Sequence, residues 1–131
     1  MVSREMKTEK QKVGNIGESL ACRFLEGSGF KIIERYFRKK WGEIDIVAEL
    51  DGVLHFVEVK ALRLRSGQAH TYMPEDAVRA WKKERLSRAI RTYLAERKIP
   101  ENQDFLIDII AIFLDFPRKK AKIRMLENVN L

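Results

Sequence analysis

The chain has 131 residues, of which 45% are hydrophobic, so it can form one compact domain with a single core and is too short for two independent ones. Its 26 lysines and arginines outnumber its 19 aspartates and glutamates, giving a net charge of +7, which is compatible with a polyanionic partner such as nucleic acid but does not prove one. A single cysteine, Cys22, excludes an internal disulfide, and the longest apolar stretch, 105–114, is too short to span a bilayer, so we expect a soluble, cytoplasmic protein.

The first predicted element is a helix, which follows a polar extension, flexible or helical, over residues 1–12. Its main apolar residues recur at three- and four-residue spacing, and Gly27-Ser28-Gly29 is a good helix stop. These apolar residues are Val13, Ile16, Leu20 and Phe24. Three segments rich in Ile, Val and aromatic residues follow, with the lengths typical of strands, at 30–37, 43–50 and 53–61.

A second helix is predicted from Pro74-Glu75-Asp76, where a proline and two acids mark a helix start, to about Arg97. A buried strand at 105–116 and a weaker one at 121–126 complete the chain. A strand that is joined through a helix to another strand usually has it as a parallel neighbour, so the sheet should be mixed. We therefore predict a single α/β domain over 1–131, with a mixed sheet flanked by helices in the order α-β-β-β-α-β and a possible terminal strand.

The Asp51-Gly52 pair is a strong hairpin signal, which favours a two-residue type I′ turn and fixes the register of the flanking strands. It predicts that Asp45 lies opposite Glu58 and that Glu43 lies opposite Lys60. Because side chains alternate between the two faces of a strand, these four groups share one face. The other face is then almost wholly apolar, with Ile44, Ile46, Ala48, Leu50, Val53, His55, Val57 and Val59.

Opposed carboxylates repel across a strand pair, and a divalent cation such as Mg²⁺, which binds oxygen ligands, would offset the repulsion between Asp45 and Glu58. Lys60 would place a positive charge beside that cation, where it can help to position water or neutralise charge on a phosphate. The alternative is an exposed ladder of ion pairs, in which Lys60 and Arg63 satisfy the acids.

Two helical residues are candidates for the flanks of this site. Glu18 lies on a semi-buried stripe with small residues, and Gly14 and Gly17 allow its helix to approach another backbone closely; a capping or solvent-facing role is the alternative. Lys82 falls in the apolar stripe of the second helix, so it either reaches toward the acidic site or extends its amino group to the surface. That stripe comprises Val78, Lys82, Leu86, Ala89 and Tyr93, whereas Arg85, Arg88 and Arg91 fall roughly on the opposite side and are expected to face solvent.

These residues resemble the YraN family of small bacterial proteins, and the likeness runs from about Gly14 to Ile112. The matching motifs are Gly14, Gly17-Glu18, Ala21, Leu25, Gly29-Phe30, Gly42-Glu43-Ile44-Asp45, Ala48, Phe56-Val57-Glu58-Val59-Lys60 and Lys82. That family is similar in turn to archaeal Holliday junction resolvases and to nucleases of the PD-(D/E)XK superfamily. The resemblance implies a restriction-endonuclease-like core, whose order of helix, three strands, helix and strand agrees with the order predicted above.

By this resemblance, Asp45 and Glu58 bind Mg²⁺ or Mn²⁺, with the main-chain carbonyl of Val59 as a further ligand. Lys60 is the catalytic lysine and Glu18 an auxiliary acid, while the role of Glu43 stays open. The chain also departs from the family pattern. Ala61-Leu62-Arg63 replaces the usual Thr and Arg after the lysine, the asparagine common after the first strand is replaced within Tyr36-Phe37-Arg38, and the 66–73 loop is longer than usual.

The resulting hypothesis is a Mg²⁺-dependent endonuclease that hydrolyses phosphodiester bonds in DNA, with branched or recombination DNA as a candidate substrate. The alternative is a nucleic-acid-binding or assembly protein that uses a nuclease fold without turnover. Basic residues near the site are candidates for phosphate contacts, and the resemblance also suggests a homodimer. These nucleic-acid-binding candidates are Lys82, Arg63, Lys39 and Lys40, ranked above Arg38 and Arg65.

Overall fold

The computed structural model describes residues 8–64 and 80–130. Its elements are α1 (Glu9–Gly27), β1 (Lys31–Lys39), β2 (Gly42–Leu50), β3 (Val53–Arg63), α2 (Ala80–Glu96), β4 (Phe105–Asp115) and β5 (Lys120–Leu126). The predicted α/β order is therefore confirmed, including the terminal strand. The predicted start of the second helix at Pro74, the 66–73 loop and Arg65 lie outside the described residues. No helix within the described ranges is long and apolar enough to cross a membrane.

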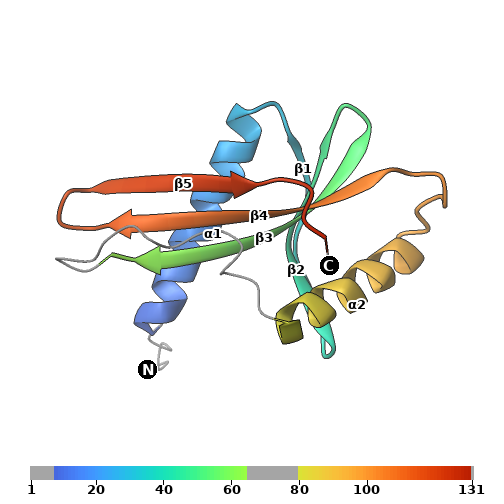
Figure 1. Cartoon of the computed structure of the whole chain (residues 1–131), viewed down its shortest axis with the longest axis horizontal. Helices are drawn as coiled ribbons and strands as arrows, with labels where there is room; N and C mark the ends of the chain where they lie inside the picture. Colours follow the sequence, from blue (N-terminus) through green and yellow to red (C-terminus); the bar gives the residue numbers. More distant parts are fainter. Residues whose placement is uncertain (1–7, 65–79, 131) are drawn as a thin grey trace, which may run out of the picture.

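The five strands form one sheet in the order β1-β2-β3-β4-β5. β3 and β4 are parallel neighbours, and the other three pairings are antiparallel, so the sheet is mixed as predicted. Figure 1 shows α1 crossing one face of this sheet, while β1 and β2 run across the direction of the other strands toward α2. The two helices therefore cover different parts of the sheet and produce two apolar clusters, one against each helix.

α1 begins with a capping box, in which the Gln11 N–H donates to the Thr8 hydroxyl at 3.1 Å and the Thr8 N–H donates to Gln11 Oε1 at 2.9 Å. Its buried face differs from the predicted stripe, since Ile16 is 39% exposed. The reason is the close approach at Gly17, where an added Cβ would lie 2.4 Å from Ala61 Cβ. This contact turns the helix so that its buried residues are Val13, Gly17, Ala21, Cys22 and Leu25.

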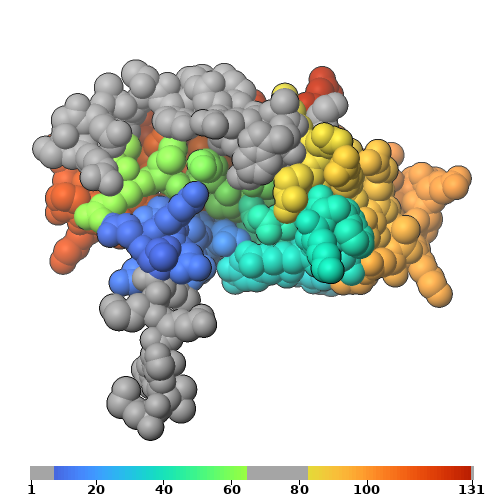
Figure 2. Space-filling model, turned by 90° about the horizontal axis from the view of Figure 1, so that it is seen from below, coloured from blue at the N-terminus to red at the C-terminus, as the bar shows by residue number. Residues whose placement is uncertain are grey.

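α2 packs with the stripe that its sequence predicts, because Leu86, Ala89 and Tyr93 are all buried. The turn between β1 and β2 rests on this helix. The indole N–H of Trp41 donates to Thr92 Oγ1 at 2.9 Å, and an added Cβ at Gly42 would lie 2.0 Å from the Arg85 carbonyl oxygen. In Figure 2 this turn (turquoise) lies directly against the first half of α2 (yellow). α2 thus fixes the end of β2 from which the acidic residues project.

The hairpin between β2 and β3 has the predicted turn, with positive φ at both Asp51 (50°) and Gly52 (80°). Its register is also as predicted, from Leu50 opposite Val53 to Ile46 opposite Val57. The ladder of paired residues ends at that last pair, however. The predicted cross-strand pairs Asp45 with Glu58 and Glu43 with Lys60 are therefore wrong as strand partners, because β2 leaves β3 before reaching them.

The alternation of faces is also broken at this point. Ile46 packs in the cluster against α1, whereas Ile44 packs with Phe37 against α2, so the prediction that Ile44 and Ile46 share a face is wrong. Tyr36, which lies between the paired positions Arg35–Ile46 and Phe37–Ile44, has φ 57°. At this left-handed residue, the side chains of β1 change the face of the sheet to which they point. Those of β2 change face at the same level. Asp45 consequently sits at the twist, between the two faces of the sheet.

Candidate functional site

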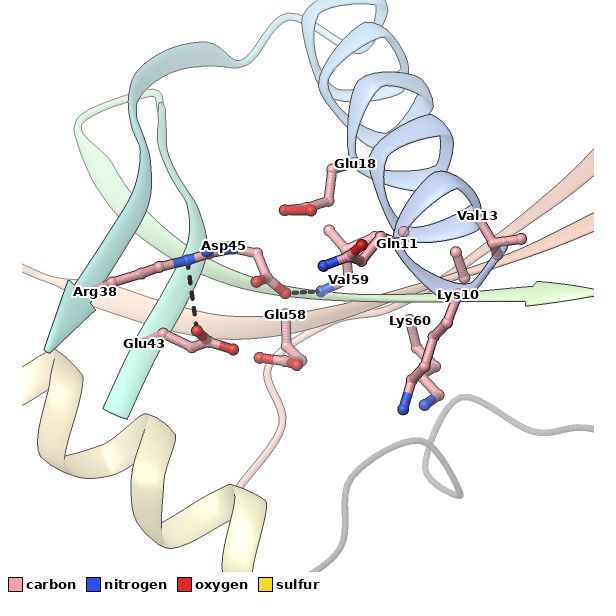
Figure 3. Close-up of a pocket in the computed structure, with 12 residues that line it drawn as sticks. Lys10, Gln11, Val13, Glu18, Arg38, Glu43, Asp45, Glu58, Val59 and Lys60 are labelled. Atoms are coloured by element: carbon pink, nitrogen blue, oxygen red, sulfur yellow. Dashed lines mark hydrogen bonds and ion pairs between the residues drawn. The ribbon is translucent and has the colours of Figure 1, made fainter. Parts of the chain in front are cut away.

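A pocket of about 410 Å³ lies where β2 separates from β3, beside the N-terminal half of α1. Figure 3 shows side chains from α1, β1, β2 and β3 gathered around it. Its charged residues are four acids, Glu18, Glu43, Asp45 and Glu58, and three cations, Lys10, Arg38 and Lys60. The structure thus brings together the acids and the lysine that the sequence predicts for the site, with Val59 among the other lining residues.

Asp45 and Glu58 form the buried part of the pocket, with exposed fractions of 9% and 5%. Asp45 Oδ2 accepts a hydrogen bond of 2.8 Å from the main-chain N–H of Val59. The carboxylate therefore occupies the place that a β2 carbonyl would take if the ladder continued, which satisfies the buried N–H where the strands part. This hydrogen bond fixes Asp45 next to Glu58 without neutralising either acid.

The electrostatic surroundings of Asp45 are unfavourable to its charge. Burial and the neighbouring Glu58, in that order, raise the pKa of Asp45 well above its usual range, and Glu18 and Glu43 raise it further. The hydrogen bond from Val59 opposes this shift, because it favours the ionised form. A cation in the pocket would remove this conflict, because it stabilises the charged form of the acid that the protein otherwise disfavours.

Glu18 projects from α1 over the pocket, and Figure 3 shows its carboxylate turned toward Asp45. Its Oε2 atom is buried and has no hydrogen-bond partner. Burial raises the pKa of Glu18, although Arg38 and Arg35 oppose this shift. The capping and solvent-facing alternatives for Glu18 therefore do not fit. An orphaned buried oxygen that faces other acids is a site where a cation, a water molecule or a donor from a ligand is required.

The cations of the pocket come from two sides. Lys60 follows Glu58 on β3, and Figure 3 draws its amino group near that of Lys10 from the first turn of α1. On the opposite side, Arg38 Nε lies 3.5 Å from Glu43 Oε2, in an exposed ion pair. The alternative of an ion-pair ladder is thus present in part, but Arg38 pairs with Glu43, whereas Arg63 pairs with Glu9.

Three other predicted phosphate contacts, Arg63, Lys39 and Lys40, are not among the residues that line the pocket. Arg63 pairs with Glu9 and stacks on Phe116, with its guanidinium carbon 5.0 Å from the ring centroid. Lys39 Nζ lies 2.8 Å from Glu96 Oε2. Lys40 is exposed in the turn between β1 and β2. Lys82 lies in the first turn of α2, and its side chain is outside the described part of the structure.

Two pocket cations were missed or ranked low from the sequence. Lys10 belongs to the segment interpreted as an extension, although the Thr8–Gln11 capping pattern signals a helix start there. Arg38 is the cross-strand partner of Glu43. That pairing could be found only from the β1–β2 register, and Lys40-Trp41 carries none of the residues that mark a tight hairpin turn.

The donor set fits a hard divalent cation, since Asp45, Glu58 and Glu18 offer only oxygen atoms. Among the described residues, no group of three or more His, Cys, Asp or Glu side chains could hold a metal ion as it stands. Asp45 and Glu58 would therefore hold Mg²⁺ or Mn²⁺ with additional oxygens from water or from a substrate. This is usual for Mg²⁺, which is bound by one or two carboxylates together with water and phosphate oxygens.

Comparison with known proteins identifies similar chains over most of this length. A model of the uncharacterised protein family UPF0102 matches residues 17–112. A UPF0102 protein of Campylobacter hominis is 32% identical over 126 residues, which cover 96% of this chain and 100% of that protein. A Helicobacter pylori relative is 36% identical over 126 residues, covering 96% and 97%, and one from Geotalea daltonii is 41% identical over 108 residues, covering 82% and 81%.

Proposed function

The chain belongs to the uncharacterised protein family UPF0102, and we propose that it is a Mg²⁺-dependent endonuclease that hydrolyses phosphodiester bonds in DNA. The observation that carries this proposal is the buried pair of Asp45 and Glu58, next to the unpartnered oxygen of Glu18 and with Lys60 in the same pocket. A bound cation would stabilise the ionised forms of Asp45 and Glu18, whose pKa values burial raises, and the lysine beside them suits an anionic substrate.

Asp45 and Glu58 would hold the cation, and the Val59 main chain fixes the Asp45 carboxylate through its N–H group. A bound Mg²⁺ would supply electrostatic stabilisation of the negative charge that develops on the phosphate. The protein supplies the rest of the environment: β3 sets the spacing between Glu58 and Lys60, and α1 lays Glu18 over the pocket. This rigid placement on strands and a helix is what phosphodiester chemistry requires, since it depends mainly on positioning and charge stabilisation.

In the proposed reaction, water adds its oxygen to phosphorus, the bond between phosphorus and one ester oxygen breaks, and the departing oxygen receives a proton. The free oxygen of Glu18 is available to accept a hydrogen bond from that water. The Lys60 ammonium lies at the pocket wall, where it can contact a phosphate oxygen or the water. Glu43 acts on Arg38 through their ion pair, which assigns it a positioning role.

A second candidate function is nucleic-acid binding or assembly without turnover. It is favoured by one observation, namely that the described acids do not already form a group of three that could hold a metal ion. The two functions differ in their dependence on metal. A binding protein of this kind would associate with DNA equally well in the presence and absence of divalent cations and would leave it intact.

The test is incubation of purified protein with Mg²⁺ or Mn²⁺ and linear, nicked, flapped or four-way DNA. At least one substrate should be cut, and Asp45→Asn should lower the rate at least about 100-fold, as expected for loss of a central electrostatic group. The matched control is Asp104→Asn, since Asp104 is exposed and outside the pocket. Cutting that survives Asp45→Asn would come from a contaminant and would contradict the proposal.

A further inference from the structure

Tyr36 combines two features that are rarely found together in a strand residue. Its φ of 57° is left-handed, a conformation that Asn and Gly adopt much more easily than a bulky aromatic residue. It is also 38% exposed, so the ring is not retained for packing in a core. The twist at Asp45 requires a left-handed residue at this position, but it does not require a tyrosine. The aromatic side chain therefore needs a separate explanation.

Two arginines surround the Tyr36 ring. The guanidinium carbons of Arg35 and Arg38 lie 4.9 and 5.1 Å from the ring centroid, and Arg35 Nη2 donates to the Tyr36 hydroxyl at 2.8 Å. Such cation–π contacts hold guanidinium groups in place without removing their charge. The Arg38 side chain remains 61% exposed. Ring and guanidinium groups consequently form one solvent-accessible surface.

This surface borders the acidic pocket. Arg38 lines the pocket and contacts Glu43, two residues before Asp45 on β2. On β1, Tyr36 lies between Arg35 and Phe37. The β2 partners of these two residues, Ile46 and Ile44, lie on either side of Asp45. Anything bound at Asp45 and Glu58 would therefore have its neighbouring groups beside Arg38, which lines the pocket and contacts the Tyr36 ring.

We propose that Arg35, Tyr36 and Arg38, named here the Tyr36 platform, bind the nucleotide next to the phosphodiester bond that is cut. In this proposal the Arg38 guanidinium, which lies over the Tyr36 ring in the structure, moves to a phosphate, and the ring face that it leaves stacks on an unpaired base. The proposal rests on the proposed nuclease function. It adds a substrate class, namely nucleic acid with an unpaired nucleotide beside the cleavage position, as in a flap, a branch or a single strand.

The chemistry of the platform favours an unpaired nucleotide over a regular duplex. A base within a duplex has both faces stacked on its neighbours, so only its edges and its phosphates are accessible. Aromatic rings interleaved with arginines are instead the usual means of holding single strands, because every base offers a face for stacking and every nucleotide a phosphate. An arginine pair without the ring would bind the phosphates of a duplex as well as those of a single strand.

The test measures DNA binding in an Asp45→Asn background, in which the DNA stays uncut. Three labelled probes of shared sequence are used: a single strand, a blunt duplex and a duplex with a single-stranded flap. Adding Tyr36→Asn should weaken binding of the single strand and the flap at least about tenfold, with little change for the blunt duplex. Tyr36→Phe, which keeps the ring and loses only the hydroxyl, should bind all three probes much as the parent does.

Arg38→Gln provides a second readout. It should weaken binding of all three probes and reduce the slope of log affinity against log salt by about one, whereas Tyr36→Asn should leave the slope unchanged. Folding is controlled by melting temperature. The Asn variant should melt above the Phe variant, because asparagine adopts the positive φ at lower cost.

The outcomes separate the platform from the proposed function. If Tyr36→Asn binds the single strand and the flap as tightly as its parent, or loses affinity for all three probes equally, the platform is wrong. If the parent binds none of the probes, the platform is contradicted, whereas the nuclease is contradicted only if the wild type cuts none of the DNA substrates. If binding depends on Tyr36 as described but the wild type cuts no DNA with Mg²⁺ or Mn²⁺, the platform is supported and the nuclease is contradicted.

Discussion

Within residues 8–64 and 80–130, acidic side chains are buried in two regions, and their hydrogen bonding differs between the two. Asp108 on β4 is 0% exposed, and both of its oxygens have partners: His55 Nδ1 lies 2.6 Å from Oδ2, and the Asn128 N–H donates to Oδ1 at 3.0 Å. In the acidic pocket Asp45 accepts a hydrogen bond from the Val59 N–H, and Glu18 has a buried oxygen without a hydrogen-bond partner.

This difference separates a structural acid from a functional one. A buried carboxylate with all its hydrogen bonds made ties elements together, as Asp108 ties β3, β4 and the segment after β5. A cluster of buried acids with hydrogen bonds missing destabilises the fold on its own, and it is tolerated where a ligand completes it. Substitutions at the two regions should therefore change stability in opposite directions, and only one region should respond to metal.

The largest expected difference concerns metal affinity. Asp45→Asn should weaken Mn²⁺ binding by more than about 100-fold, above the loss caused by removing an outer partner of a metal ligand. Asp108→Asn should leave the affinity of the folded protein unchanged. Isothermal titration calorimetry of the wild type, Asp45→Asn and Asp108→Asn measures these Mn²⁺ affinities. Equal Mn²⁺ affinities for the wild type and Asp45→Asn would contradict the distinction between the structural acid Asp108 and the functional acid Asp45.

The next largest effect concerns stability at the structural acid. Asp108→Ala should lower the free energy of unfolding by about 3 kcal/mol, because it leaves the buried His55 ring nitrogen without its partner and removes the acceptor of the part-buried Asn128 N–H. Urea unfolding followed by circular dichroism provides the measurement. A loss below about 0.5 kcal/mol, the range of an ordinary surface substitution, would show that the Asp108 contacts are not structural.

Substitution of two glycines on α1 tests whether the close approach of this helix to β3 positions Glu18 at the pocket. Gly17→Ala should cost about 1–3 kcal/mol, because its Cβ would meet Ala61 Cβ at 2.4 Å and push the helix away from β3. Gly14→Ala should stabilise the protein by up to about 1 kcal/mol, since nothing lies within 4 Å and alanine favours a helix. Denaturant midpoints compare the two variants, and equal midpoints would contradict the close approach at Gly17.

The smallest effect is a gain of stability at the functional acid. The raised pKa of Asp45 means that the folded protein prefers the protonated form, so the ionised form destabilises it at neutral pH. Asp45→Asn keeps an oxygen for the Val59 N–H and removes this charge. In metal-free buffer at pH 7.5 the variant should melt higher than the wild type, with about 4 °C for each 1 kcal/mol gained.

The sign of this effect can be checked by varying the pH. As the pH falls through the raised pKa, Asp45 takes up its proton in the folded wild type, and the advantage of the Asn variant should shrink. A melting-temperature difference that grows toward acidic pH would contradict the assigned charge state. Added Mn²⁺ should raise the melting temperature of the wild type and leave that of the variant unchanged.

Much of the fold could be predicted because its elements carry local signals. The Asp51-Gly52 turn fixes the β2–β3 register, and the period of Leu86, Ala89 and Tyr93 fixes the buried face of α2. The face of α1 was less predictable, since it depends on a contact between Gly17 and a distant strand. The break at Tyr36 has no local signal, because a tyrosine gives no indication of a left-handed backbone.

The sequence predicts which residues form the candidate site, but not how they are arranged. Spacing and resemblance indicate Glu18, Asp45, Glu58 and Lys60, and all four line one pocket. Their arrangement depends on the point where β2 leaves β3, which tertiary packing against two helices decides. The exposed cations were the least predictable, because a long basic side chain pairs with whichever acid the fold brings near it, as Arg63 does with Glu9.

The central claim, that the acidic pocket holds a divalent cation, is tested most directly by a crystal soaked in Mn²⁺ and measured for anomalous scattering. A manganese peak is expected between the carboxylates of Asp45 and Glu58, and it should be lost in crystals of Asp45→Asn. A pocket without a peak in wild-type crystals soaked at a concentration that saturates binding in solution would contradict this claim.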